Sequence, residues 1–76
     1  MDFEVLKKVM VDVLNVDESE ILLENSFADD FGADSLDLFQ IITGVEEELS
    51  IEVLPEEVEK IRTVEEAVRL IEKKVN

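Results

Sequence analysis

Hydrophobic residues recur every three or four positions in three stretches of the chain, which is the spacing of one face of an α-helix. We expect the first helix over residues 2–15 and the second over residues 35–49. The apolar stripe of the second helix is wider than a solvated surface helix needs, which indicates contacts on more than one side. The third stretch predicts a final helix that begins at Thr63, where Glu66 completes a capping box.

The segments between these stretches predict a long loop and one short helix. Residues 17–31 form an acidic connection, in which residues 17–20 can start a short helical turn. Pro55 suits the first turn of a short helix that runs through Ile61. We therefore expect one all-α domain, residues 1–76, built as a four-helix bundle of three long helices and one short helix. The long loop joins the first and second helices.

Charge is distributed unevenly along the chain. It has 21 acidic and 7 basic residues, a net charge of −14, and no basic residue between Val9 and Glu59. Such a surface repels nucleic acid and anionic lipid but attracts basic protein surfaces. Solubility explains this charge less well than partner attraction does, because a net charge of this size also destabilises a compact fold through self-repulsion. We expect protein partners that carry basic patches, and no nucleic acid partner.

The chain contains no cysteine and no histidine. It therefore lacks disulfides, a catalytic thiolate, the usual general base and the usual imidazole metal ligand. Residues 29–32 do not fit the spacing of a calcium-binding loop, and residues 46–48 are typical of a solvated helical face, so we assign no metal ligand. No apolar run approaches membrane-spanning length, and the start lacks a signal-peptide pattern. We expect a monomeric cytoplasmic protein that does not insert into membranes.

Ser35 stands where the acidic loop turns into the second helix. Asp34 is the expected N-cap and Asp37 its capping partner, so Ser35 falls in the first helical turn. Free N–H groups and the positive end of the helix dipole favour a phosphate there. Ser35 is then a structural serine, a hydrolytic nucleophile or an acceptor that another enzyme modifies. The nucleophile is excluded because it needs a base, and the chain has neither a histidine nor a nearby lysine.

The pattern around Ser35 extends over most of the chain. Residues 26–37 read Ser-Phe-Ala-Asp-Asp-Phe-Gly-Ala-Asp-Ser-Leu-Asp. Val-Glu-Glu-Glu-Leu follows at 45–49, Pro-Glu-Glu-Val-Glu-Lys-Ile at 55–61 and Thr-Val-Glu-Glu-Ala at 63–67. Together these segments resemble the bacterial acyl carrier proteins of type II fatty acid synthesis.

The resemblance implies a carrier and not an enzyme. A phosphopantetheinyl transferase would attach 4′-phosphopantetheine from coenzyme A to Ser35, which Asp34 and Leu36 flank. The thiol of this arm would carry growing acyl chains as thioesters. It would present them to ketoacyl synthases, ketoacyl reductase, dehydratase, enoyl reductase and acyltransferases.

The resemblance also implies two further surfaces. Partner enzymes would contact one face of the second helix, made of Asp37, Gln40, Thr43, Glu46 and Glu47. The acyl chain would enter the bundle among apolar residues. These are Phe27, Phe39, Ile42, Leu49, Val58, Ile61 and Ile71.

Two alternatives stay open. Gln40, Thr43 and Gly44 stand where the family usually has glutamate, a larger apolar residue and alanine. A carrier of a specialised pathway, such as polyketide, aminoacyl or lipopolysaccharide assembly, fits such a face. The other alternative is an acidic interaction module, which needs no modified serine.

Overall fold

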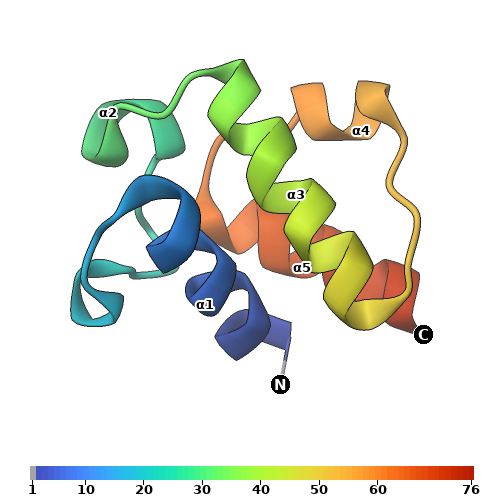
Figure 1. Cartoon of the computed structure of the whole chain (residues 1–76). Coiled ribbons are helices and arrows are strands. Elements are labelled where there is room, and N and C mark those ends of the chain that lie inside the picture. Colours follow the sequence, from blue (N-terminus) through green and yellow to red (C-terminus); the bar gives the residue numbers. More distant parts are fainter. Residues whose placement is uncertain (1) are drawn as a thin grey trace.

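The computed structural model describes residues 2–76, and all of its regular elements are helices (Figure 1). They are, in chain order, α1 (Asp2–Leu14), the 3₁₀-helix η1 (Glu18–Glu20), α2 (Phe27–Phe31), α3 (Ser35–Leu49), α4 (Pro55–Glu59) and α5 (Val64–Val75). The expected all-α class is confirmed. Residue 1, the first of the expected domain 1–76, lies outside the described residues.

One hydrophobic core holds the helices together. In Figure 1, α3 crosses the middle of the molecule, with α1 on one side of it and α4 on the other. The largest fully buried side chains are Leu6, Met10, Ile41, Ile42, Val45, Val58, Val64 and Ile71. Burying each Leu, Ile or Val contributes about 1.5–3 kcal/mol, so this core is the main favourable term in folding. No polar or charged residue among residues 2–76 is buried.

The loop between α1 and α3 contains more structure than one expected turn. The turn is η1, and the N–H of Asp17 donates to Oε1 of Glu20 over 3.1 Å. The additional helix, α2, begins after Ser26, whose Oγ accepts from the N–H of Asp29 over 3.2 Å. It ends at Gly32, which adopts the left-handed conformation with φ of 63°. Glycine tolerates this conformation without steric cost.

A backbone strap joins this loop to the start of α5. The N–H of Phe27 donates to the carbonyl of Arg62 over 3.0 Å, and the N–H of Val64 donates to the carbonyl of Asn25 over 3.0 Å. A third bond, over 2.9 Å, runs from the N–H of Glu65 to the carbonyl of Leu23. Main-chain bonds of this kind depend little on side chains, so α2 is held beside the α4–α5 turn.

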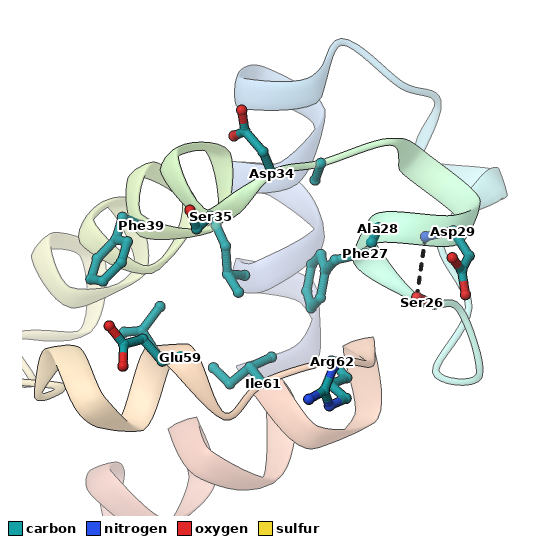
Figure 2. Close-up of a pocket in the computed structure, with 13 residues that line it drawn as sticks. Ser26, Phe27, Ala28, Asp29, Asp34, Ser35, Phe39, Glu59, Ile61 and Arg62 are labelled. Atoms are coloured by element: carbon teal, nitrogen blue, oxygen red, sulfur yellow. Dashed lines mark hydrogen bonds between the residues drawn. The ribbon is translucent and has the colours of Figure 1, made fainter.

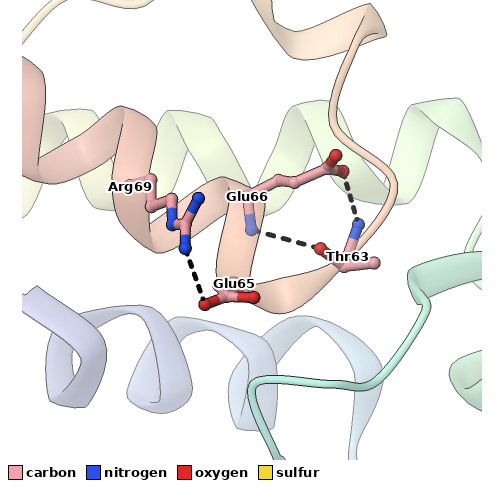
Figure 3. Close-up of polar contacts among 4 residues, drawn as sticks. All are labelled: Thr63, Glu65, Glu66 and Arg69. Atoms are coloured by element: carbon pink, nitrogen blue, oxygen red, sulfur yellow. Dashed lines mark hydrogen bonds and ion pairs between the residues drawn. The ribbon is translucent and has the colours of Figure 1, made fainter.

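The start of α5 confirms the predicted capping box (Figure 3). Thr63 Oγ1 accepts from the N–H of Glu66 over 3.2 Å, and Glu66 Oε1 accepts from the N–H of Thr63 over 3.0 Å. The N–H of Arg62 donates to the same Oε1 over 2.7 Å. These donors, Arg62 first, lower the pKa of Glu66 from its ordinary value of 4.5. One turn later, Arg69 pairs with Glu65 at 3.1 Å.

Gly44 lies where α3 approaches α1 most closely. A Cβ atom added at position 44 would lie 2.7 Å from Cγ1 of Val9, which is far inside van der Waals contact. Val9 is buried and β-branched, so its side chain cannot easily rotate away. The glycine in the middle of α3 is therefore explained by helix packing.

We predict that Gly44→Ala destabilises the protein. Alanine gains about 1 kcal/mol of helix propensity over glycine, but overpacking against Val9 costs about 1–3 kcal/mol. A net loss of about 1 kcal/mol should appear as a lower urea midpoint. In a Val9→Ala background the same substitution should stabilise α3, because the opposing methyl groups are gone. Equal stabilisation in both backgrounds would refute the contact.

We also predict that Glu66 makes stability fall in acid. Its pKa is lower in the folded chain than in the unfolded chain, so its contribution is complete above the unfolded value of 4.5. That contribution is lost as the pH falls through the folded value. Urea midpoints measured against pH should therefore drop less steeply for Glu66→Gln than for the parent protein. Glu72→Gln, an exposed change further along α5, should follow the parent curve. A Glu66→Gln curve parallel to the parent would contradict the argument.

Candidate functional site

Ser35 is the first residue of α3, and two aspartates fix its position. Oδ1 of Asp34 accepts from the N–H of Asp37 over 2.9 Å. Oδ2 of Asp37 accepts in turn from the N–H of Asp34 over 3.2 Å. This reciprocal capping box confirms the helix start expected from the sequence. It leaves the N–H groups of Ser35 and Leu36 without a partner in the described part of the chain.

The Ser35 side chain is exposed, and its hydroxyl makes no hydrogen bond within residues 2–76. A structural serine at a helix start uses its hydroxyl to cap a backbone N–H, and here Asp34 does that instead. The free hydroxyl, the free N–H groups and the helix dipole suit a phosphoester at this oxygen. The residues present therefore fit a phosphate-linked group at Ser35.

A cavity of about 370 Å³ opens beside Ser35 (Figure 2). α2 forms one wall, the first turns of α3 form another, and the end of α4 with the residues after it closes the third. Four of the apolar residues expected around an acyl chain lie in this lining: Phe27, Phe39, Val58 and Ile61. The cavity thus places an apolar surface directly beside the exposed hydroxyl.

Three other residues of the expected acyl pocket do not line this cavity. Ile42 and Ile71 are buried in the closed core, 2% and 0% exposed. Leu49 is half-buried at the far end of α3 from Ser35. Helical periodicity identifies residues that face inward, but it does not separate those around a cavity from those packed against other side chains.

The lining also includes residues outside the expected acyl pocket. Ala33 and Leu38 add apolar surface, while Asp29, Glu59 and Arg62 add charge. Leu38 lies on the buried apolar face of α3, and helical periodicity alone predicts its inward position. Asp29 and Arg62 line the same cavity because the backbone strap holds α2 beside the α4–α5 turn.

The expected partner face of α3 divides into two groups. Three of its residues, Gln40, Thr43 and Glu47, are exposed. They share one stripe with exposed Leu36, because these four positions are spaced by four, three and four residues. Leu36 is the most exposed large apolar residue of the described chain, at 66%.

The other two expected partner residues, Asp37 and Glu46, are engaged within the chain. Asp37 closes the capping box, and Oε2 of half-buried Glu46 accepts from the N–H of Val53 over 2.7 Å. No sequence pattern predicts that bond, which spans the loop from α3 to α4. Glu47 is therefore the carboxylate of this face that no internal contact occupies.

Two properties of the described residues bear on the type of site. Within residues 2–76, no group of three or more acidic, histidine or cysteine side chains is arranged to hold a metal ion. None of the helices in that range has the length and apolar character needed to cross a bilayer.

Comparisons with known proteins place the chain in a family. The sequence pattern described as the phosphopantetheine attachment site matches residues 4–71. An acyl carrier protein of Petrotoga mobilis is 47% identical over 74 residues, which cover 97% of this chain and 87% of the relative. An acyl carrier protein of Clostridium acetobutylicum is 46% identical over 71 residues, covering 93% and 92%. The resemblance noted in the sequence is thus confirmed, and the chain belongs to the acyl carrier proteins.

Proposed function

We propose that this chain carries acyl groups as thioesters on a 4′-phosphopantetheine arm, and that the arm is attached to the Ser35 hydroxyl. The supporting observation is that Ser35 combines an exposed, unbonded hydroxyl with the first turn of α3 and the mouth of an apolar cavity. When attached, the arm supplies a thiol, which this cysteine-free chain otherwise lacks. The chain acts as a carrier and leaves catalysis to other enzymes.

The residues around Ser35 have separate tasks in this proposal. The hydroxyl is the acceptor, and the free N–H groups of Ser35 and Leu36 stabilise the phosphoester charge. The base that removes the hydroxyl proton comes from the phosphopantetheinyl transferase, because this chain has no histidine. Asp29 and Glu59 give the mouth of the cavity a negative potential that favours a basic enzyme.

The cavity has a second task, which is to shelter part of the acyl chain. Each methylene that leaves water for the apolar lining contributes about 0.8 kcal/mol. Phe27, Leu38 and Val58 offer such a surface without any change of the fold. Deeper entry, toward Ile42 and Ile71, requires the helices to separate, because both side chains lie in the closed core.

Fatty acid synthesis is the pathway that the relatives favour, with ketoacyl synthases, ketoacyl reductase, dehydratase, enoyl reductase and acyltransferases as partners. A specialised pathway remains the second candidate because of one observation. Gln40 and Thr43 are both exposed at the centre of the α3 stripe, so its middle is uncharged. Partners that depend on charge there would bind this stripe less well than partners that use apolar and polar contacts.

We predict that coenzyme A and a broad-specificity transferase add one phosphopantetheine to the protein. Intact-mass spectrometry should show the gain for the parent protein and none for Ser35→Ala. Ser26→Ala is the matched control, because Ser26 lines the same cavity and its hydroxyl caps α2. It should still be modified if the fold survives, which circular dichroism would establish. Modification of Ser35→Ala at another serine would overturn the assignment.

We further predict that Glu47→Lys slows docking to basic partner enzymes. The substitution reverses the one unoccupied carboxylate on the exposed stripe, so transfer should be several-fold slower at low salt. Added salt should slow the parent and narrow the difference, because it screens exposed charges. Glu72→Lys on α5 makes the same charge change away from α3 and should have little effect. Equal slowing by both variants would show that only net charge matters.

A further inference from the structure

Arg62 is the one cation among the residues that line the Ser35 cavity. The other charged residues of the lining, Asp29, Asp34 and Glu59, are all acidic. Figure 2 shows Arg62 beside Ile61, across the cavity from Ser35. A single positive charge in an acidic cavity marks the place where an anion is most stable.

The backbone of Arg62 is fixed on both sides. Its N–H donates to Oε1 of Glu66 over 2.7 Å, and its carbonyl accepts from the N–H of Phe27 over 3.0 Å. Both bonds use main-chain atoms of Arg62, so they anchor the residue at the cavity wall and leave the guanidinium group free. The side chain therefore starts from a defined position.

The guanidinium group also lacks an ion-pair partner within residues 2–76. Four other cations lie within 4.0 Å of a carboxylate oxygen: Lys7, Lys8, Arg69 and Lys74. Arg62 has no such neighbour in the described part of the chain. The carboxylate of Glu66 accepts a bond from the Arg62 N–H and not from the guanidinium group. The Arg62 charge contributes to the lowered pKa of Glu66, but it does so through space and without an ion pair.

We propose that Arg62 binds an anionic group carried on the arm at Ser35. The inference rests on the proposed function, because it needs the arm. A guanidinium group forms paired hydrogen bonds with the oxygens of phosphates and carboxylates. Two groups have this chemistry: the phosphodiester at the base of the arm, and a carboxylate at the end of an acyl cargo. In the bound state, the positive charge of Arg62 offsets the repulsion that Asp29, Asp34 and Glu59 exert on either group.

The test compares four forms of the protein: without the arm, with the arm, and with the arm loaded with butyryl or succinyl groups. These cargoes share a four-carbon skeleton and end in a methyl group or a carboxylate. Thermal midpoints are measured for the parent, Arg62→Gln and Arg69→Gln in each form. Arg69→Gln is the matched control, because it removes the same charge from α5 outside the cavity lining. Intact mass first establishes that each form carries its arm and cargo.

We expect the thermal midpoint of Arg62→Gln to lie further below that of the parent, by a few degrees more, in the forms that carry the anionic group. Widening on attachment of the arm identifies the phosphodiester, and widening only between butyryl and succinyl identifies the carboxylate. The Nε–H resonance of Arg62 should shift at the same step. A deficit that stays constant in all four forms, as for Arg69→Gln, would overturn the inference. A protein that gains no arm would refute the proposed function itself.

Discussion

The structure depends on the packing of α3, which must be buried along most of its length and still expose its first turn. Ile41 and Val45 are fully buried in the core, and Gly44 lets α1 approach closely. Burial of this kind fixes the helix axis. The capping box of Asp34 and Asp37 then sets where the helix begins, at a point outside the core. The exposed hydroxyl of Ser35 is a result of both constraints.

Electrostatic repulsion acts against this packing, because the chain carries a net charge of −14. Within residues 2–76, two ion pairs join helices that are distant in sequence. Lys8 of α1 lies 3.2 Å from Glu48 of α3, and Lys74 of α5 lies 2.8 Å from Glu57 of α4. Lys74 is the largest contribution to the lowered pKa of Glu57. Both pairs lie near the surface, so they offset repulsion locally and contribute little beyond that.

The long helices could be predicted because periodicity and caps indicated the same boundaries. α3 has the expected bounds, and α5 starts after Thr63 as its capping box predicted. α1 ends at Leu14, one residue earlier than expected, and Asn15 adopts a φ of 58°. Each of these helices has several turns, which is enough for a hydrophobic face to repeat.

The short elements and the cavity were harder to predict. α2 has five residues, so no face can repeat, and only Ser26 and Gly32 marked its ends. α4 ends at Glu59, before the expected Ile61, since Lys60 serves as its C-cap. The charged wall of the cavity depends on backbone bonds between segments far apart in sequence, which no local pattern records.

The bond from Glu46 to Val53 has a consequence for protein engineering. Reversing a carboxylate on a recognition helix changes partner binding alone only when that carboxylate makes no contact within its own chain. Here one of those carboxylates spans the connection between α3 and α4. Reversing it would change the partner surface and loosen the connection together, so the two effects could not be separated. Changes to partner specificity should begin with Leu36, Gln40, Thr43 and Glu47, because these exposed side chains take no part in the bond between α3 and the following loop.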